Sequence, residues 1–596
     1  MKKRAAKLIC LLMVAAMLFL AAACTQTPQQ VTPPADGAQQ QAPPQEGAGE
    51  ALFTAGTFTG TAPGFAGPLS ISVTVSEDRI ESIALGEHYD TIGIADVAFD
   101  ILSQRIIEHQ SLAVDAVSGA TLTSFGVQGA VSAALMEAGA DAGAIRRPVE
   151  RPEVTQGPTE NVDVVIVGSG FAGLMAAYEL HFNNPDLSFV LLEQLDFIGG
   201  QTATTGGVIY SPTTPLSSED FDVQTVIDLF TYQSREPVRG NLIRNLFAPG
   251  YELLTRYLEM GATFYDDAET RGAGDYWLNV NRHTQSGPGF ATFWHNFVAA
   301  NPIDLRTASQ ATGLLVNADG EVYGVSVRSR YSEYEIHASA VLLATGGFGF
   351  NDELKAEYLP MFHPRNNIAR VMPGATGDGI LFTRRFGTPV VGQGAIHGVL
   401  RPTFDFATIP APFIVNTAGE RFANEAYVFG VIQALDGGAV TAFRIADSNL
   451  EISALEARLE AGALMAHDSL EDLARARGID VDTFLATVQA YNAAVDAQES
   501  PGFGLPADAA RRIDAPPFFS EQVRSSHIGT IPGILVDDYL RVLDGSNNPV
   551  PGLYAAGEVM FGNFFTRIYP AGGTAISTAS YGGPVAIRTI LSDLES

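Results

Sequence analysis

The first folding pattern along the chain lies between residues 51 and 142. Apolar and polar residues alternate through 68–85, which predicts two strands that each bury one face. Apolar residues then recur at helical spacing through 94–110 and again through 125–139, which predicts two helices. We expect a small α+β unit over 51–142, called the front unit below.

A larger pattern starts at residue 161 and continues to the C-terminus. An apolar strand, a glycine-rich turn, an apolar helix and a second apolar strand follow one another through 163–193. This order is typical of a Rossmann-like α/β fold that binds a nucleotide. We call this part the main unit.

The main unit is expected in two pieces. The region 395–515 has helical patterns of its own near 469–497, which indicates an inserted α+β cap. We call 395–515 the inserted unit, and the two pieces of the main unit are then 161–394 and 516–596. A Pro- and Glu-rich linker at 143–160 joins the front unit to the main unit.

The N-terminus has the pattern of an export signal. Basic residues precede an apolar run at 8–22, which is too short to span a membrane but fits the core of a signal peptide. The run ends in Leu-Ala-Ala-Ala-Cys24, which resembles a bacterial lipobox. We therefore expect a lipoprotein signal over 1–24, with Cys24 lipidated and the protein held on the extracytoplasmic face of the cell membrane. The alternative is an ordinary secreted protein cleaved after Ala23. The Gln- and Pro-rich stretch 25–50 is expected to be a disordered tether.

Composition narrows the possible chemistry. Lys and Arg total 35 against 66 Asp and Glu, a formal net charge of −31, which argues against nucleic acid as a partner. The chain has two Cys, of which Cys10 lies in the signal and Cys24 is the expected lipid site. No thiol then remains for a metal or iron–sulfur centre, and no c-type haem motif occurs. We expect organic redox cofactors and no metal.

The glycine-rich turn of the main unit has the spacing Gly168-x-Gly170-x-Ala172-Gly173. Such a turn lets a pyrophosphate approach the backbone and rest on the N-terminus of the next helix. Glu193 ends the second strand about 20 residues later, where an acidic side chain binds ribose hydroxyls. The pattern predicts a bound dinucleotide.

Further glycine motifs extend this prediction to FAD. The segments "QLDFIGGQTATTGG", "VLLATGGFGFN", "PGATGDGI" and "GLYAAGEVM" resemble, in that order, the FAD motifs of the fumarate reductase/succinate dehydrogenase flavoprotein superfamily. That superfamily includes flavocytochrome c fumarate reductases, urocanate reductases and 3-ketosteroid dehydrogenases. The resemblance implies non-covalent FAD, with Asp378 lining the isoalloxazine and Glu558 holding ribityl or ribose hydroxyls. It also places the following residues at the cofactor: Gly199, Gly200, Thr202, Gly207, Gly557, Thr574, Ala575 and Ile576.

The stretch "DAVSGATLTS" in the front unit has two interpretations. Ser118 or Thr121 could cap the helix that follows, because a side-chain oxygen there satisfies a free backbone N–H. Alternatively, Asp115-x-x-Ser118-Gly-Ala-Thr121 resembles the flavinylation signal of FMN-binding domains. In those domains a flavin transferase joins FMN to the last Thr by a phosphoester bond. With export and an FAD unit on the same chain, we favour covalent FMN at Thr121.

The family resemblance also bears on the substrate. In the resembled reductases, hydride adds to the β-carbon of an alkene conjugated to a carbonyl or carboxylate, and a protein group protonates the α-carbon. This chain has Phe429 where fumarate-type members place their Arg proton donor, and Pro570 where they place a substrate-clamping Arg. Because a dicarboxylate needs such cations, we expect an enone or enoate that is not a dicarboxylate.

The segment "RIYPAGG" instead resembles the 3-ketosteroid dehydrogenases. By that resemblance Tyr569 and the Gly573 N–H would polarise a substrate carbonyl as an oxyanion-hole pair. Tyr427 is the favoured proton donor, with a packed aromatic ring as the alternative. His397 would contact substrate or serve a structural role, and His527 lies two positions from an expected His. Arg401 and Arg567 are candidate cations that could equally form surface ion pairs.

Together these patterns predict an extracytoplasmic, lipid-anchored reductase. A membrane electron donor would reduce FMN, and electrons would pass through FAD to an activated C=C bond in anaerobic respiration. One alternative is a ketosteroid-dehydrogenase-like desaturase that works in the opposite direction. The other is a non-catalytic carrier with two flavins.

Overall fold

The structure is a computed structural model. In a few of the residues that it describes, His397 and Arg401 among them, the backbone alone is described. It describes residues 51–90, 93–141, 143–234, 236–265, 269–273, 276–284, 286–360, 367–392, 396–401, 411–426, 430–432, 434–435, 441–450, 452, 455–460, 462–565, 569 and 572–595.

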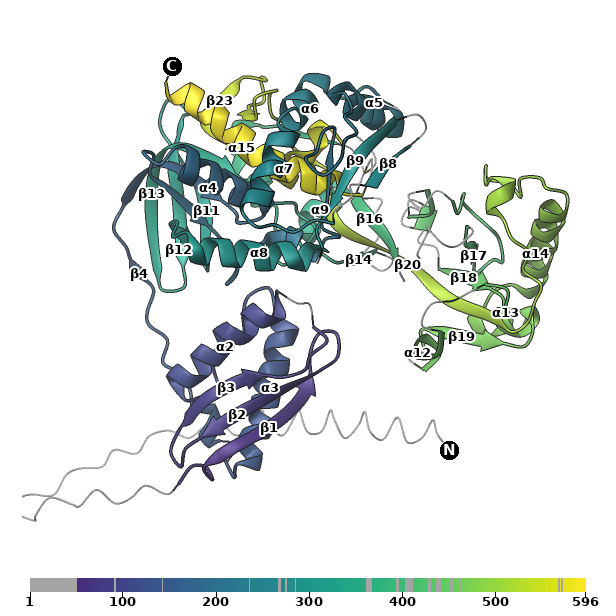
Figure 1. Cartoon of the computed structure of the whole chain (residues 1–596), viewed down its shortest axis with the longest axis horizontal. Coiled ribbons are helices and arrows are strands. Elements are labelled where there is room, and N and C mark those ends of the chain that lie inside the picture. Colours follow the sequence, from purple (N-terminus) through teal and green to yellow (C-terminus); the bar gives the residue numbers. More distant parts are fainter. Residues whose placement is uncertain are drawn as a thin grey trace, which may run out of the picture. The chain divides into compact units, whose positions relative to one another are not determined.

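The front unit is an antiparallel sheet covered by two helices (Figure 1). Alternate residues of the central strand are buried, as its pattern predicts, and pack against both helices. The first strand was not predicted, because three of its residues are exposed threonines and its one buried residue is Gly60. There a Cβ on Gly60 would lie 1.9 Å from the Ala130 carbonyl oxygen, so only glycine lets this strand approach the second helix. The elements are β1 (Gly56–Pro63), β2 (Pro68–Val75), β3 (Ile80–Leu85), α2 (Ala95–His109) and α3 (Thr121–Glu137).

The main unit is built on a sheet that has nine strands in the described part of the chain. The central strand β13 is parallel both to β5, from the first piece of the unit, and to β23, from the second. The two pieces expected from the sequence therefore meet in one sheet. Its strands are β4 (Thr155–Gln156), β5 (Glu160–Val167), β6 (Phe189–Leu192), β10 (Leu305–Arg306), β11 (Ser309–Val316), β12 (Val322–Ser329), β13 (Ser332–Leu343), β22 (Arg541–Leu543) and β23 (Pro549–Ala555).

Two helices from opposite ends of the main unit pack side by side (Figure 1). They are α4 (Phe171–Asn183) and α15 (Thr574–Leu594). A Cβ on Gly583 would lie 2.2 Å from the Ala172 carbonyl oxygen, so a glycine permits the close crossing. The other helices and short strands of this unit are β7 (Val208–Ser211), α5 (Val223–Ser234), α6 (Gly240–Phe247), α7 (Gly250–Glu259), β8 (Glu269–Ala273), β9 (Tyr276–Arg282), α8 (Ser286–Ala300), α9 (Asp352–Tyr358), α10 (Asp378–Thr383), β15 (Val390–Val391) and β21 (Gly533–Ile534).

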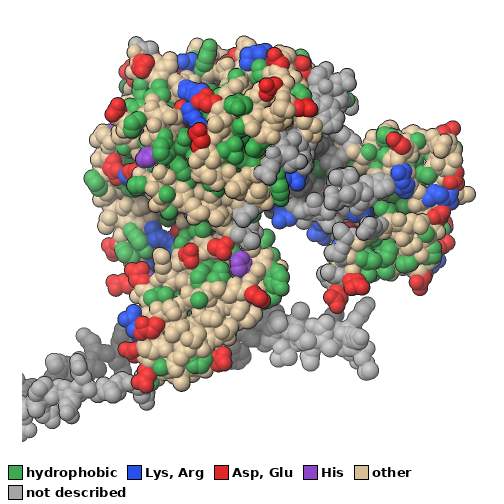
Figure 2. Space-filling model, in the orientation of Figure 1, with side chains coloured by type: hydrophobic (Ala, Val, Ile, Leu, Met, Phe, Trp, Pro, Cys, Tyr) green, Lys and Arg blue, Asp and Glu red, His purple; other side chains and the backbone are tan. Residues whose placement is uncertain are grey.

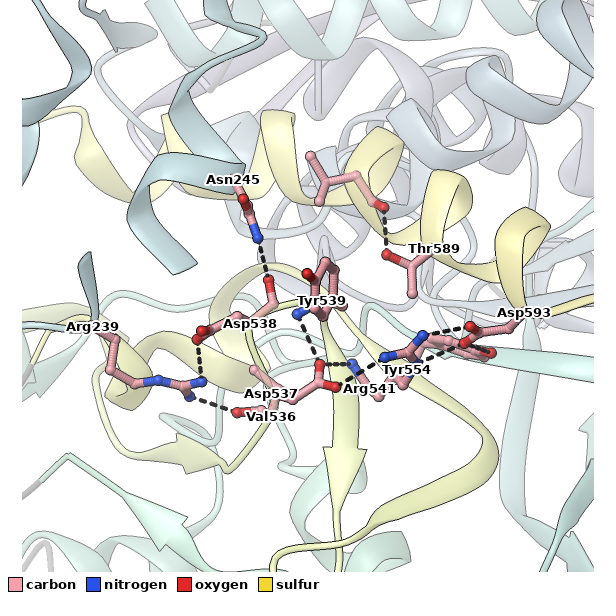
Figure 3. Close-up of polar contacts among 11 residues, drawn as sticks. Arg239, Asn245, Val536, Asp537, Asp538, Tyr539, Arg541, Tyr554, Thr589 and Asp593 are labelled. Carbon is pink, nitrogen blue, oxygen red and sulfur yellow. Dashed lines mark hydrogen bonds and ion pairs between the residues drawn. The ribbon is translucent and has the colours of Figure 1, made fainter. Parts of the chain in front are cut away.

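Polar contacts fix the C-terminal end of α15 (Figure 3). The Asp593 carboxylate accepts hydrogen bonds from the Arg541 Nε (2.7 Å) and the Tyr554 hydroxyl (2.8 Å). The nearby turn is held by Arg239, which donates to Asp538 at 2.6 Å. These bonds tie the helix to β22 and β23, and so to the sheet whose other strands carry the nucleotide loop.

The inserted unit is joined to the main unit through one long strand, β20 (Phe518–Thr530), seen between the two parts in Figure 1. Its first half pairs with β18 and β19, and its second half pairs with β14 and β16. The strand begins just after residue 516, where the inserted unit is expected to end, yet its first half belongs to the sheet of the inserted unit. The elements around it are β14 (Asn367–Ala369), β16 (Ile396–Arg401), β17 (Phe413–Asn416), β18 (Ala442–Ala446), α12 (Leu455–Glu460), β19 (Leu464–His467), α13 (Leu470–Arg477) and α14 (Val481–Asp496).

Acidic side chains are spread over the face drawn in Figure 2, with Lys and Arg among them. Within the described residues, no helix combines the length and the apolar character needed to cross a bilayer. No group of three or more His, Cys, Asp and Glu side chains in those same residues is placed to hold a metal ion.

Candidate active site

The glycine-rich turn lies between β5 and α4 and lines two adjoining cavities of about 290 and 80 Å³. Gly168 has φ +106°, and a Cβ there would lie 2.4 Å from the Ala344 carbonyl oxygen. A Cβ on Gly173 would lie 1.9 Å from the Gly168 carbonyl oxygen. A Cβ on Gly170 would meet no protein atom within 4 Å and would enter the cavity instead. The turn is therefore a cradle that leaves room for a phosphate at the uncapped N-terminus of α4.

Glu193 lies where the motif predicts, at the smaller cavity. One carboxylate oxygen accepts from the Ser169 N–H (3.0 Å) and the Ser169 hydroxyl (2.6 Å), and the other accepts from the Leu195 N–H (2.8 Å). Burial raises the pKa of Glu193, against the lowering effect of these donors. The residue is thus built into the turn and positioned to accept from a ribose hydroxyl.

The glycine pair Gly199-Gly200 packs directly on the glycine-rich turn. The Gly199 N–H donates to the Ser169 carbonyl at 2.9 Å, and a Cβ on Gly200 would lie 3.1 Å from the Gly170 Cα. Thr202 follows in a short 3-10 helix, Gly200–Thr204, and lines the larger cavity. Gly207 comes after this helix, at the turn that leads into β7, and is not among the lining residues described.

Asp378 lies at the start of a short helix. It begins α10 and lines the smaller cavity together with Glu193, whereas Tyr569 and Gly573 line the larger one. Burial raises the pKa of Asp378, which Thr376 and Gln310 contact by hydrogen bonds. The Asp378 carboxylate therefore lies at the nucleotide end, and not beside the groups expected to act on substrate.

Glu558 lies where the two cavities meet and lines both. Its Oε1 accepts from the Thr530 N–H (2.7 Å) and the Thr530 hydroxyl (3.1 Å). Burial raises the pKa of Glu558 to about 7 despite these donors. A Cβ on Gly347 would lie 1.9 Å from this oxygen, which explains why the second glycine of "ATGGFG" has no side chain. Gly557, next to Glu558, also lines the larger cavity.

Tyr569 and Gly573 lie together at the N-terminus of α15, but they are bonded to each other. The Tyr569 hydroxyl oxygen accepts from the Gly573 N–H (3.0 Å) and the Ala575 N–H (2.9 Å), and Thr574 contacts it as well. Burial raises the pKa of Tyr569. The two groups are therefore bonded to each other and are not parallel donors aimed at one point. Ala575 and Ile576 line the same cavity, whereas Thr574 is fully buried.

His527 does not line either cavity. Its Nε2 lies 3.1 Å from the Gly349 carbonyl oxygen, and burial lowers the pKa of the ring. Its neighbour Ile528 lines the larger cavity instead, because successive side chains of a strand point to opposite faces. Tyr427 and Arg567 lie outside the described residues, and the side chains of His397 and Arg401 are not described.

Two glutamines that the sequence motifs did not predict shape the smaller cavity. Gln194 donates to the Gly374 carbonyl at 2.7 Å, and Gln201 accepts from the Met372 N–H at 2.7 Å. They hold the 370–374 segment over the nucleotide turn. The apolar lining of the larger cavity by Phe171, Val208 and Phe561 was not predicted either. Only the position of Gln194 directly after Glu193 could have signalled a role.

In the front unit, neither Ser118 nor Thr121 caps the helix. The N-cap of α3 is Ala120, with no side-chain cap bond, and Thr121 is an exposed residue in the first turn. The capping interpretation is therefore wrong. Leu122 and Phe125 beside it are 57% and 59% exposed. A hydroxyl at an uncapped helix N-terminus beside exposed apolar side chains fits a bound flavin phosphate.

Comparisons with known proteins agree with this geometry. Residues 163–576 match the family of the FAD-binding domain, and residues 64–136 match the FMN-binding domain. The NADH:acrylate oxidoreductase of Vibrio harveyi is 28% identical over 595 residues, which cover 86% of this chain and 59% of that protein. The urocanate reductase of Eggerthella lenta is 27% identical, over 86% of this chain and 88% of its own length.

One solved structure, the open conformation of a flavocytochrome c3 fumarate reductase, gives a TM-score of 0.62 at 25% identity. The match covers 77% of this chain and 85% of the reductase chain. The chain spans less than two thirds of the length of the acrylate oxidoreductase. The α/β fold and the resemblance inferred from the motifs are confirmed. Because the FAD-binding match extends over more than half of its residues, the chain belongs to the FAD-binding domain family of fumarate reductase-like flavoproteins, preceded by an FMN-binding domain.

Proposed function

We propose that this protein is an extracytoplasmic, membrane-anchored reductase of activated C=C bonds. A membrane donor supplies electrons to FMN joined to Thr121 by a flavin transferase, and the acceptor is an enone or a monocarboxylic enoate. Bound FMN and FAD would supply the electron relay and the hydride. The remaining tasks, which are substrate binding, polarisation and protonation, fall to the residues of the chain.

Two departures from the fumarate-type motif support this substrate class, because Phe429 and Pro570 stand where fumarate-type members place Arg side chains. A dicarboxylate would need cationic partners on both ends. The relatives in Vibrio harveyi and Eggerthella lenta are named for acrylate and urocanate, each of which carries one carboxylate on an alkene.

Tyr569 is the group we assign to the substrate carbonyl. Its side chain lines the larger cavity, and two backbone N–H groups hold its hydroxyl oxygen in place. Reduction of one C=C bond adds a hydride to one carbon and a proton to the other. A phenol O–H directed at the carbonyl stabilises the negative charge that hydride addition places on that oxygen. Tyr427 remains the proposed source of the proton.

An acceptor panel tests the proposal. Holoprotein reduced anaerobically with dithionite is mixed in turn with acrylate, urocanate, a cyclic enone and fumarate, and flavin reoxidation is followed by absorbance. We expect reoxidation by an enone or a monocarboxylic enoate, and none by fumarate. If no alkene reoxidises the flavin while a saturated ketone bleaches the oxidised protein, the desaturase interpretation replaces this one.

Tyr569→Phe tests the assigned residue. We expect reoxidation by the active acceptor to slow by about 100-fold or more, the scale of losing one oxyanion-hole donor. Tyr554→Phe is the control, because this tyrosine is also buried but is bonded to Asp593 away from the cavity. An unchanged rate in Tyr569→Phe would show that Tyr569 does not act on the substrate carbonyl.

Thr121→Ala tests the FMN attachment. Protein co-produced with a flavin transferase is run on a denaturing gel and inspected for flavin fluorescence. We expect the fluorescent band to disappear in Thr121→Ala and to remain in Thr59→Ala, which removes an exposed threonine hydroxyl from β1. Fluorescence that persists in Thr121→Ala would place the attachment elsewhere.

A further inference from the structure

A single buried carboxylate connects the Thr121 loop with the FAD-binding domain. Asp196 follows β6 in the main unit, and its side chain is 6% exposed. Its Oδ2 accepts from the Ser118 N–H of the front unit at 2.8 Å. Its Oδ1 accepts from Arg105 of α2 at 2.8 Å and from Arg330, between β12 and β13, at 2.5 Å. Three separate parts of the chain therefore converge on one carboxylate.

The backbone next to this carboxylate is shaped for close contact. Gly119 has φ +96°, a conformation that favours glycine, and a Cβ there would lie 2.8 Å from the Phe197 ring. Leu195 and Phe197 are buried in the same apolar cluster as Val117 and Ala120 of the front unit. The core of the front unit is thus completed by residues of the main unit.

The two guanidinium groups also hold the loop itself. Arg105 donates to the Asp115 carbonyl at 3.1 Å, and Arg330 lies 3.7 Å from the Asp115 carboxylate. Segment 115–118, which leads into Thr121, is therefore fixed at both ends. A buried carboxylate is stable only when it is paired and hydrogen-bonded, and here every partner but Arg330 belongs to the front unit.

The same short segment of the main unit serves both cofactor sites. Glu193, at the nucleotide cavity, is bonded to the Leu195 N–H, and Asp196 is the next residue. Asp196 lies three positions after Glu193, and Thr121 lies three positions after Ser118, so each stretch spans at most about 11 Å. The contact thus joins the expected FMN attachment to the ribose end of the FAD site by a short path.

We propose that Asp196 is a positioning residue, a latch that docks the FMN-binding domain on the FAD-binding domain in the arrangement that passes electrons between them. This inference rests on the proposed relay from FMN to FAD. Thr121 is exposed in the docked arrangement, so the latch leaves it accessible to a flavin transferase.

The test uses the full-length holoprotein with Asp196→Asn, which removes the charge and keeps the size of the side chain. Asp304→Asn is the control, because the Asp304 side chain pairs with Arg306 within the main unit. Covalent flavin is measured first and is expected to be unchanged. Two rates are then followed anaerobically: FAD reduction through FMN, and reoxidation of fully reduced FAD by the substrate.

We expect Asp196→Asn to slow FAD reduction through FMN by about tenfold or more, because the docked fraction falls with the lost contact free energy. Reoxidation of reduced FAD by substrate should stay unchanged, a separation that general destabilisation would not produce. Protease cleavage in the linker 143–160 should become faster in Asp196→Asn and not in Asp304→Asn. Arg330→Met serves as a second variant if Asp196→Asn does not fold.

Unchanged linker cleavage together with unchanged FAD reduction in both latch variants would overturn the proposal. Failure of the relay itself has a different signature. In that case Thr121→Ala would accept electrons into FAD as fast as the wild type. Linker cleavage would still report whether Asp196 docks the front unit.

Discussion

Three carboxylates at the FAD site, Glu193, Asp378 and Glu558, share one physical property. Burial raises the pKa of each, although each accepts hydrogen bonds from the protein. A ligand that donates further hydrogen bonds would stabilise the charged form of these carboxylates, and the hydroxyls of a ribityl or ribose chain are hydrogen-bond donors of this kind. The acidic side chains therefore indicate a polyhydroxylated ligand more directly than the glycine motif does.

Glu558 gives a pH-dependent prediction. Its pKa is about 7 in the folded apoprotein, and the ordinary value is 4.5, so the folded state binds the extra proton between these values. The free energy of unfolding of the apoprotein should fall as pH rises through that window, by about 3 kcal/mol more than in Glu558→Gln. Denaturant titrations of both apoproteins at the two ends of the window measure the difference. Equal pH dependence in the two proteins would contradict the prediction.

Some residues of the site could be predicted from the sequence and others could not. The glycines and Glu193 follow from local motifs, because a strand, turn and helix fix their own geometry. His527 could not be placed, because a one-residue change of strand register exchanges its position with that of Ile528. Gln194 and Gln201 were missed because their partners lie in the distant 370–374 segment.

At the scale of elements, one glycine of the turn between β5 and α4 is needed for folding and another leaves room for the ligand. A Cβ on Gly173 collides with backbone, whereas a Cβ on Gly170 enters the cavity. Gly170 has φ −69°, which alanine adopts without strain. The two glycines therefore serve different purposes within one motif.

A pair of alanine variants tests this division. Gly170→Ala should keep the thermal stability of the apoprotein and weaken FAD binding by about 100-fold, or about 2.7 kcal/mol. Gly173→Ala should destabilise the apoprotein by about 3 kcal/mol, the cost of overpacking. Calorimetry of the apoproteins and FAD titration separate the two effects. Wild-type FAD affinity in Gly170→Ala would show that the pyrophosphate lies elsewhere.

The predicted elements were those with strong periodicity. The strands β2 and β3, the helices α2 and α3, and the β5–α4 turn all lie where the apolar pattern indicates. The strand β1 was missed because glycine and threonine replace apolar residues, and its burial depends on contact with α3. The span of β20 across two units could not be read from a local pattern, because its pairing partners are distant in sequence.

At the scale of the whole molecule, the proposed lipid at Cys24 would decide where the protein is held. Cys24→Ser removes the acceptor thiol for the lipid, and a net charge of −31 gives no electrostatic attraction to anionic lipid. We expect the variant to leave the membrane fraction while its flavin content stays unchanged. Fractionation and labelling with a radioactive fatty acid check this. Membrane retention equal to that of the wild type would refute the anchor.

The split construction of the main unit has a consequence for biosynthesis. The glycine turn is made early, but Glu558, Tyr569 and the start of α15 follow the inserted unit, and β23 joins β13 late. A nascent chain therefore carries half a binding site until its final segment has emerged. If the chain is exported unfolded, as the proposed function implies, FAD would be loaded on the far side of the membrane. The supply of FAD in that compartment would then limit how much protein matures.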